Sequence, residues 1–361
     1  MKKLVFVANW GNKEEKAWSG TMPGVHAALK KMYDIERFDI RLKVFPLIIL
    51  RILEKLKLGR FDMTYMKYYN KKFQKAYKDC ETINVLQFDE CPNGEGINSY
   101  IYQDLSVGFL LDQYNNNPEL IPYLGLGNLS KKYLVKRQKQ QLEFYDKAAG
   151  IFTMGKWLAD YLVTKENIPK DKVFNVGGGI NLDPKMIDYS KKTGNRILFV
   201  GRDFERKGGD LVVEAFKKLK KVNSDAELYI AGPTVNPVKE NDIDGLFFMG
   251  ERTYEQLTEL YNMCDVFCMP SRFEAYGLVF AEALAFGLPC VARNAYAMKE
   301  IIKDGETGYL INSDDTDELA DKMLKALQDT KMMQHVKEMK EWYIEEYSWD
   351  KVAKRMADVV K

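Results

Sequence analysis

Apolar and polar positions follow two periodicities along the second half of the chain. Short β-branched or aromatic runs between turn residues predict strands, and longer stretches with one apolar face predict helices. The strand runs lie at residues 196–200, 227–231, 246–249, 266–269, 290–292 and 308–311. The helical stretches include residues 211–219, 254–263, 278–286 and 316–327. Strands that alternate with helices at this spacing are typical of a parallel, doubly wound sheet.

The first half begins in the same way but is less regular. The expected strands lie at residues 4–8, 83–88, 149–154 and 173–176. A polar run at residues 189–195 precedes the strong strand that begins at Arg196, and such a run is typical of a linker. The sequence therefore predicts an α/β protein with two domains, one over residues 1–188 and one that begins at residue 189.

Composition and charge fit this organisation. The chain has 361 residues, of which 46% are hydrophobic, and this is ample for two cores. Its 54 basic and 52 acidic residues balance to +2, which is too even for a protein that mainly coats nucleic acid. Residues 1–188 carry 29 basic and 22 acidic side chains (+7), and residues 189–361 carry 25 and 30 (−5). The two domains are therefore expected to differ in electrostatic character.

The sequence gives no sign of a disulfide framework, a zinc site or a membrane span. The five cysteines are odd in number, and none lies in a Cys-x-x-Cys or Cys/His cluster. No window reaches about 18 uncharged apolar residues, and the apolar run at residues 4–8 is too short for a signal peptide. We therefore expect reduced thiols and a cytoplasmic protein.

The loop after the strand 196–200 combines turn residues with cations. It contains Arg202 and Lys207, and it leads through Gly208 and Gly209 into a helix. A helix N-terminus after a strand offers free N–H groups and partial positive charge, so this turn is suited to a diphosphate. Neither a Walker loop nor a Gly-x-Gly-x-x-Gly dinucleotide motif is present. Taken alone, the stretch also fits a solvated charged loop.

A second candidate loop follows the strand 266–269. Gly277 stands at an expected helix start, where its N–H and that of Leu278 can face an anion. Glu274 precedes this helix and Glu282 lies more than one turn inside it, so the two should contact different parts of one extended ligand. Glu282 has apolar neighbours, and a buried carboxylate needs a partner such as a ribose diol. Spacing alone leaves open that both are ordinary surface glutamates.

Both candidate loops belong to a longer series of short motifs. They are Gly201-Arg202 with Lys207-Gly208, Ala231-Gly232-Pro233, Gly250-Glu251-Arg252, Pro270-Ser271-Arg272-Phe273-Glu274, Gly277-Leu278, Glu282-Ala283-Leu284-Ala285 and Gly287-Leu288-Pro289. In this order and spacing the chain resembles the family 4 retaining glycosyltransferases, the glycosyl transferases group 1. The stretch 347–353 is similar to the family's last helix. Resemblance in the first domain is limited to the opening strand, Ser19-Gly20-Thr21 and residues 176–180.

The resemblance implies a GT-B fold, in which two Rossmann-like domains face each other across a cleft. It places an acceptor-side domain at residues 1–188, joined by a returning C-terminal helix at 346–361, and a nucleotide-sugar domain at 189–345. The implied donor-binding residues are Gly20, Arg202, Lys207, Arg252, Thr253, Glu274, Tyr276, Gly277, Leu278 and Glu282. Arg202 and Lys207 would hold the diphosphate. Glu282 would hold the ribose, and Glu274 the donor sugar.

One position departs from the family pattern. Family members often carry a His of the first domain near the reacting sugar, but this chain has only His26 and His335, which suit structural or surface roles. The segment 102–106 occupies roughly the place of that His, so Asp104 is the substitute candidate. The expected catalytic residues are Glu274, Arg202, Lys207 and Asp104.

The implied reaction transfers a hexosyl group from a nucleoside-diphosphate sugar, with UDP favoured over GDP, to a saccharide or lipid-linked acceptor in polysaccharide or glycoconjugate synthesis. Departure of the diphosphate builds negative charge on phosphate, which the cations and a helix dipole would stabilise. The departing phosphate can itself accept the acceptor's proton, so no strong side-chain base, metal or cofactor is expected. Asp242-Ile243-Asp244 has metal-site spacing, but it lies in a polar loop and we interpret it as a solvated turn.

The acceptor side contains a basic segment at residues 41–78. Eleven basic residues stand there against Glu54 and Asp62, interleaved with seven aromatic residues. Such a segment is typical either of a surface helix near anionic lipid or of a packed helical pair with a basic outer face. The first interpretation predicts peripheral contact with the inner face of the plasma membrane. A nucleic-acid surface is disfavoured because the aromatics interrupt helices and do not line a sheet.

Two rival functions belong to other classes. An NAD-dependent oxidoreductase would also use two Rossmann-like domains, but the dinucleotide motif after the first strand is missing. A non-catalytic GT-B partner subunit would have no need to retain Arg202, Lys207, Glu274 and Glu282 together.

Overall fold

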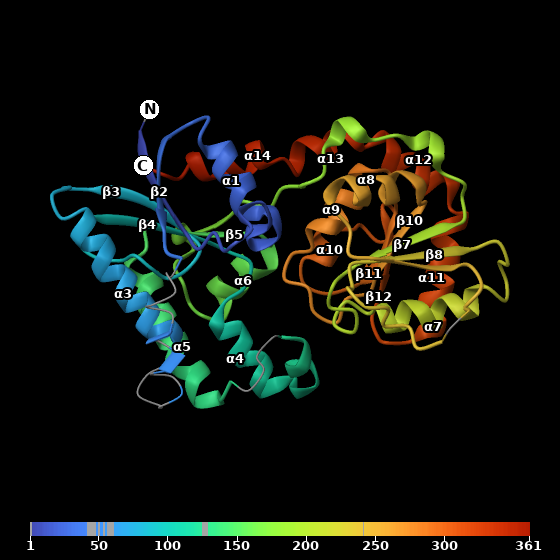
Figure 1. Cartoon of the computed structure of the whole chain (residues 1–361), viewed down its shortest axis with the longest axis horizontal. Helices are drawn as coiled ribbons and strands as arrows, with labels where there is room; N and C mark the ends of the chain where they lie inside the picture. The colour runs from blue at the N-terminus through green and yellow to red at the C-terminus, as the bar shows by residue number, and fades with distance from the viewer. Residues whose placement is uncertain are drawn as a thin grey trace. The chain divides into compact units, whose positions relative to one another are not determined.

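The computed structural model describes residues 2–41, 48–49, 51–52, 55, 61–124, 129–240 and 242–361. The chain forms two compact units (Figure 1). Unit 1 comprises Met1–Asn116, Asn128–Gly177 and Trp349–Lys361, and unit 2 comprises Asn117–Gly127 and Gly178–Ser348. Each unit has its own sheet and its own buried core.

Unit 1 is built on a parallel sheet. Its strands in the described part of the chain are β1 (Lys3–Ala8), β2 (Asp34–Asp39), β3 (Ile83–Gln87), β4 (Ile97–Gln103), β5 (Gly150–Thr153) and β6 (Val173–Asn175). They lie in the order β2-β1-β3-β4-β5-β6, and every pair is parallel. The chain first extends the sheet on one side of β1 and then on the other. The strand order therefore reverses between β1 and β3.

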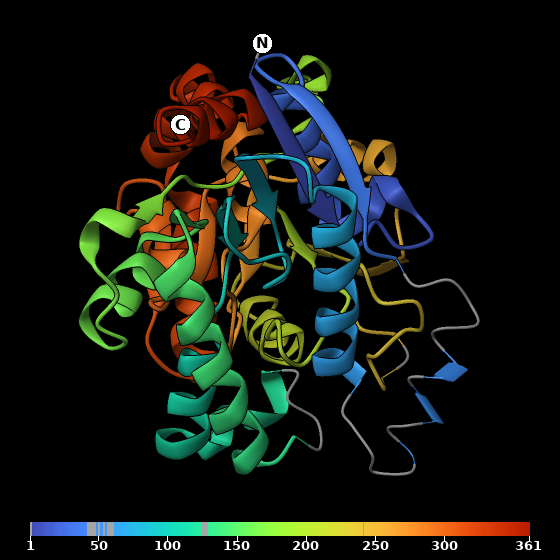
Figure 2. The same ribbon diagram turned by 90° about the vertical axis from the view of Figure 1, so that its left-hand side faces the viewer.

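Helices pack on this sheet through apolar faces. They are α1 (Thr21–Leu29), α3 (Phe61–Ala76), α4 (Val107–Asn116), α5 (Lys131–Lys147), α6 (Lys156–Thr164) and α14 (Trp349–Ala357), with the 3-10 turns η1 (Glu14–Gly20) and η3 (Lys170–Lys172). Tyr65, Tyr69 and Phe73 of α3 pack with Val85 of β3, because residues four apart share one helix face. Phe144 of α5 belongs to a second cluster. Figure 2 shows α3 (blue) and α5 (green) below the strands.

The helix α14 belongs to unit 1, although the residues before it form unit 2. It lies against α1, where Gly24 leaves room for an indole ring: a Cβ at Gly24 would stand 2.4 Å from Nε1 of Trp349. Lys31, two residues after the end of α1, forms an ion pair with Asp350 of α14 at 2.7 Å. The C-terminal helix therefore returns to the first unit, as the resemblance implies.

Unit 2 contains a second parallel sheet. Its described strands are β7 (Arg196–Val200), β8 (Glu227–Ala231), β9 (Leu246–Gly250), β10 (Val266–Met269), β11 (Cys290–Arg293) and β12 (Gly308–Ile311). They lie in the order β12-β11-β10-β7-β8-β9, all parallel, so this order reverses between β7 and β10. The strands β7, β8 and β10 are buried along most of their length, which explains their continuous apolar runs.

Helices cover both faces of the second sheet. They are α7 (Gly209–Leu219), α8 (Tyr254–Met263), α9 (Leu278–Ala285), α10 (Met298–Ile301), α11 (Thr316–Gln328), α12 (Thr330–Glu338) and α13 (Lys340–Glu346), with the 3-10 turns η2 (Pro118–Tyr123), η4 (Pro184–Met186) and η5 (Tyr189–Lys191). Figure 1 shows α7 and α11 on one face and α8 and α9 on the other. This layering confirms the doubly wound α/β class predicted from the sequence.

Two features of unit 1 differ from the sequence prediction. The strands β2 and β4 were not expected. β2 has the sequence Asp-Ile-Glu-Arg-Phe-Asp and lies at the edge of the sheet, so it lacks the apolar run by which strands are recognised.

The division between the units also lies earlier than residue 188. It falls at Gly177 and Gly178, because the residues that follow bond to unit 2. The N–H of Asn181 donates to Glu282 at 3.0 Å, and the N–H of Asp188 donates to Asn262 at 2.9 Å.

Candidate functional site

The strand order of unit 2 indicates where a ligand should bind. In open parallel sheets, ligands bind beyond the carboxyl ends of the two strands at which the order reverses. In unit 2 these strands are β7 and β10. The loops that follow them are residues 201–208 and 270–277, which are the two loops singled out from the sequence.

The structure brings Lys207 of the first loop to Glu274 of the second. Their Nζ and Oε2 atoms lie 2.5 Å apart, and the two side chains are only 14% and 12% exposed. Arg206 stands beside this pair: its Nη1 donates to the carbonyl of Phe273 at 2.8 Å and lies 3.7 Å from Glu274. Arg206 also pairs with Asp203, whose Oδ2 lies 2.8 Å from its Nε. The two cations therefore face two carboxylates, and Lys207 is the cation held directly by Glu274.

Arg202 lies in the same loop but is more exposed to solvent. Its guanidinium contacts Glu251 at 2.6 Å, and its side chain is 69% exposed. An exposed pair of this kind contributes at most about 1 kcal/mol, so Arg202 can exchange Glu251 for a phosphate at little cost. Arg252 forms no ion pair with any described residue. Thr253 caps α8, because its hydroxyl accepts from the N–H of Gln256 at 3.3 Å.

The N-terminus of α9 presents backbone donors. Gly277 caps the helix with φ +85°, a conformation that glycine adopts without strain. A Cβ at this position would stand 2.7 Å from the ring of Phe280 and 3.0 Å from the Cγ of Glu274. The N–H groups of Leu278 and Val279 donate to no group in the described part of the chain. Such N–H groups, with the helix dipole behind them, favour an anion.

Glu282 lies inside α9 and is 5% exposed. The N–H of Asn181 donates to its Oε1 at 3.0 Å, and no other described group bonds to this carboxylate. Burial raises the pKa of the Glu282 carboxyl to about 7, while the bond from Asn181 acts in the opposite direction. A carboxylate held in this way can accept hydrogen bonds from the hydroxyls of a ligand.

Tyr276 is also buried, and it contacts the glycine-rich segment at the start of unit 2. The N–H of Gly178 donates to its hydroxyl at 3.0 Å. Tyr276 and Glu282 therefore both accept hydrogen bonds from the backbone of residues 178–181. The structure gives Tyr276 a role in holding the chain, which the sequence did not suggest.

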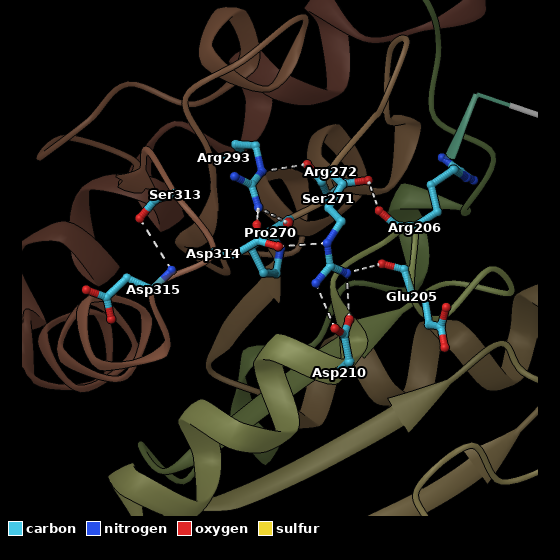
Figure 3. Close-up of polar contacts among 10 residues, drawn as sticks. All are labelled: Glu205, Arg206, Asp210, Pro270, Ser271, Arg272, Arg293, Ser313, Asp314 and Asp315. Atoms are coloured by element: carbon cyan, nitrogen blue, oxygen red, sulfur yellow. Dashed lines mark hydrogen bonds and ion pairs between the residues drawn. The ribbon is translucent and has the colours of Figure 1, made fainter. Parts of the chain in front are cut away.

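An ion-pair network fixes the loop that carries Glu274 (Figure 3). Both terminal nitrogens of Arg272 contact Asp210 of α7, at 2.8 and 2.7 Å, and its Nε contacts Asp314 at 2.8 Å. Asp314 also pairs with Arg293, whose Nε donates to the carbonyl of Ser271 at 3.1 Å. These donors are used within the protein, so Arg272 is a support for the loop. The sequence pattern did not predict this network, because its members come from four separate segments.

Unit 1 has a cavity at the carboxyl end of its own sheet. It has a volume of about 450 Å³ and lies beyond the carboxyl ends of β3 and β4. Its residues are Trp18, Met22, Met66, Phe88, Asp89, Glu90, Ile101, Tyr102, Gln103, Asp104, Leu105, Arg137 and Gln141. Gly20, which was expected to contact the donor, is the N-cap residue of α1 and has φ +86°. It lies two residues after Trp18. Asp104 therefore lies in a real cavity.

The polar groups of this cavity are organised around an ion pair. Arg137 contacts both carboxylate oxygens of Glu90, at 2.9 and 3.2 Å, and Gln141 donates to Glu90 at 2.7 Å. Gln103 and Tyr145 are hydrogen-bonded to each other, at 2.7 Å. Asp89 was not singled out from the sequence, although it stands two residues past the end of β3, where ligand-binding residues are expected.

The basic segment is only partly within the described residues, since 42–47, 50, 53–54 and 56–60 lie outside them. In α3 the aromatic residues Tyr65, Tyr69 and Phe73 are buried, and lysines 67, 71, 72 and 75 are exposed. This part of the segment is a packed helix with a basic outer face. Within the described residues, no helix combines the length and apolar character needed to cross a membrane.

Comparison with known proteins adds to this geometry. Residues 186–360 match the family model "Glycosyl transferases group 1". An uncharacterized glycosyltransferase of Methanocaldococcus jannaschii is 25% identical over 255 residues, which cover 70% of each chain. The phosphatidyl-myo-inositol mannosyltransferase of Mycobacterium leprae is 27% identical over 195 residues, which cover 51% of this chain and 52% of that one. The solved structure of a sucrose-phosphate synthase from Thermosynechococcus elongatus has a TM-score of 0.68 at 16% identity, over 99% and 98% of the two chains.

Two doubly wound parallel-sheet units, together with this structural likeness, define a protein of the GT-B fold. Residues 186–360 then match the particular group, the glycosyl transferases group 1, which agrees with the resemblance found in the sequence. The stretch shared with the mannosyltransferase spans about half the length of that protein, so its acceptor and sugar are not carried over to this chain.

Proposed function

We propose that this protein is a retaining glycosyltransferase that moves a hexosyl group from a nucleoside-diphosphate sugar to a saccharide or lipid-linked acceptor. The observation that carries the proposal is the meeting of Lys207, Arg206 and Glu274 where the strand order of unit 2 reverses. The family match over the same unit supports it. UDP is the proposed nucleotide of the donor, in preference to GDP.

The donor is proposed to bind along the end of the second sheet. Lys207 and Arg202 would contact the diphosphate, together with the N–H groups of Leu278 and Val279. The ribose hydroxyls would bond to Glu282, whose buried carboxylate gains partners in this way. Glu274 would orient the donor sugar while it holds Lys207 in place. Arg252 and the residues beside it would lie near the base.

The chemical step requires stabilisation of the leaving diphosphate. Its negative charge develops beside Lys207 and the N-termini of α7 and α9, which are fixed before the reaction and therefore need little reorganisation. In a retaining reaction on one face of the sugar, the departing phosphate can take the acceptor's proton. These side chains could thus serve without a metal, and we propose that activity is unchanged by EDTA.

The acceptor is proposed to bind in the cavity of unit 1, with Asp104 close to it. A lipid-linked acceptor has a precedent in the mannosyltransferase of Mycobacterium leprae, whose name specifies phosphatidyl-myo-inositol. The exposed lysines of α3 would support peripheral contact with an anionic membrane from the cytoplasmic side.

A ligand panel tests the donor half of the proposal. Thermal unfolding would be measured with UDP, GDP, ADP and NADH, for the wild type, for Lys207→Ala and for Lys221→Ala. Lys221 is an exposed lysine just after α7 and serves as the matched control. A ligand at about 100 times its Kd stabilises the protein by about 2.7 kcal/mol, so UDP should raise Tm by several degrees in the wild type and control.

Lys207→Ala should show little or no shift with UDP. A shift with NADH alone would contradict the proposal in favour of an oxidoreductase. Transfer itself would be followed by NMR with the donor that binds, with and without EDTA. Failure of every donor to react, with donor binding intact, would favour the non-catalytic subunit.

A further inference from the structure

The cavity of unit 1 has an aromatic wall. The ring of Trp18 meets Phe88 at 5.4 Å and Tyr102 at 5.6 Å between centroids, and Phe88 and Tyr102 lie 5.9 Å apart. All three residues line the cavity. Aromatic surfaces of this kind suit the apolar C–H face of a pyranose ring.

Trp18 is held there at a conformational cost. Trp18 and Ser19 have φ +45° and +55°, and Gly20 follows with φ +86°. Left-handed backbone at a non-glycine residue costs on the order of 1 kcal/mol or more, and such residues cluster at ligand sites. The strained turn places the indole at the cavity, which supports a binding role for this wall.

The charge of the cavity is negative. The bidentate pair of Arg137 and Glu90 neutralises itself. Asp89 forms no hydrogen bond or ion pair with its side chain in the described part of the chain, and Asp104 also lines the cavity. An anionic ligand would therefore meet the unpaired carboxylate of Asp89, whereas hydroxyl or ammonium donors would give Asp89 a partner.

We infer that this cavity selects an acceptor sugar ring that is neutral or amine-bearing, and that Asp89 is the residue that excludes anionic acceptors. The inference deepens the proposed function and rests on it, because the ligand is identified as the acceptor. The carboxylate of Asp89 accepts a hydrogen bond from a ring hydroxyl or ammonium group, while the ring lies on Trp18. Acceptors with a phosphate, sulfate or carboxylate on that ring are repelled.

The titration of Asp89 provides a test that needs no mutation. Burial, with the nearby charge of Glu90, raises the pKa of Asp89 to about 6, and Arg137 acts against this shift. The titratable groups around Asp89 also include Tyr65, Cys91 and the cavity residue Asp104. Asp89 is thus charged at pH 8 and mostly neutral at pH 5. Discrimination against anionic sugars should be strong at pH 8 and weak at pH 5.

The experiment measures binding of matched 4-nitrophenyl glycosides by calorimetry. The probes are the neutral glucoside, galactoside and mannoside, the glucuronide and galacturonide as anionic counterparts, and the 2-amino glucoside. In the wild type at pH 8, the best neutral glycoside should bind at least about tenfold more tightly than its anionic counterpart. Asp89→Asn should reduce this ratio to about threefold or less. Asp79→Asn removes an exposed carboxylate after α3 and should leave the ratio unchanged.

Three results would overturn the inference. The first is that no neutral glycoside binds, and the second is that the anionic counterpart binds equally well at pH 8. The third is that the affinity ratio of wild type at pH 8 is unchanged both in Asp89→Asn and in wild type at pH 5. If Asp89→Asn does not fold, the pH comparison on the wild type decides alone. Failure of the proposed function looks different. In that case charge selection would be seen in binding, but no sugar would be transferred from any donor of the panel.

Discussion

The two units place different groups at the carboxyl ends of their parallel sheets. In unit 2 the reversal of strand order brings Lys207 and Arg206 to one shared carboxylate, Glu274. In unit 1 the corresponding reversal opens on a cavity with an aromatic wall, where the charge of Arg137 is used by Glu90 and Asp89 has no partner among the described residues. Under the proposed function, the same Rossmann-like frame serves a diphosphate in unit 2 and hydroxyl donors in unit 1.

The difference teaches that the loops carry the chemistry. Both sheets are six-stranded and parallel over the described residues, and both reverse between their first strand and a later neighbour. Only the residues beyond the strand ends differ in kind.

The largest expected effect is in the anion site. Lys207→Ala removes a fixed cation from the leaving phosphate and leaves Glu274 with only the more distant Arg206 as a cationic neighbour. We expect the transfer rate to fall by about 10²–10³-fold, which is typical for loss of one preorganised charge. Initial rates at saturating donor would measure it, with Lys221→Ala as control. A loss smaller than about threefold would mean that unit 2 does not stabilise the leaving group through Lys207.

A second effect concerns the stability of unit 2. The pKa of Glu282 is about 7 in the folded protein and about 4.5 unfolded, so the folded state binds more protons between these values and stability falls as pH rises through them. Glu282→Gln removes this penalty. It should raise the free energy of unfolding relative to wild type by up to about 3 kcal/mol at pH 8, and by little at pH 4.

Urea unfolding at the two pH values would measure this change. Glu259→Gln, which alters an exposed glutamate of α8, should show no such pH dependence. The same Glu282→Gln protein should bind UDP more weakly than wild type. An equal gain or loss at both pH values would contradict the charged, buried state of Glu282.

The smallest of the three effects is expected in unit 1. Asp104→Asn keeps the size of the side chain and removes its charge from the acceptor cavity. We expect a fall in kcat of about tenfold, about 1.4 kcal/mol in activation free energy, because a retaining reaction leaves proton transfer mainly to the departing phosphate. Asp160→Asn, on the exposed face of α6, is the control. A loss as large as that of Lys207→Ala would show that unit 1 supplies an essential base.

The fold of unit 2 could be predicted almost completely from the sequence. Its strands are short apolar runs that helices bury on both faces, and such runs differ clearly from the amphipathic helices between them. The apolar neighbours of Glu282 suggested that it could be buried, but the sequence left a surface position open. The edge strand β2 could not be predicted in this way, because an exposed strand such as Asp34–Asp39 needs no apolar residues.

The site was predictable only where its residues fall in one motif. Lys207 and Glu274 were identified as candidates, but their contact is a consequence of strand order and not of spacing. The supports around Arg272 were missed because they act through partners that are distant in sequence. Asp89 was missed because the cavity that it lines is formed by several segments and leaves no motif in the sequence. Asp210, Asp314 and Arg293 meet Arg272 only once β7, β10 and β11 lie in their places in the sheet.

The return of α14 to unit 1 has a consequence for synthesis on the ribosome. The segments that begin unit 1 leave the exit tunnel first, but the surface of α1 around Gly24 stays uncovered until residues 349–361 have been made. Unit 2, whose last residue is Ser348, can complete its core before that time. Unit 1 is therefore completed after unit 2, although its first strand is made first.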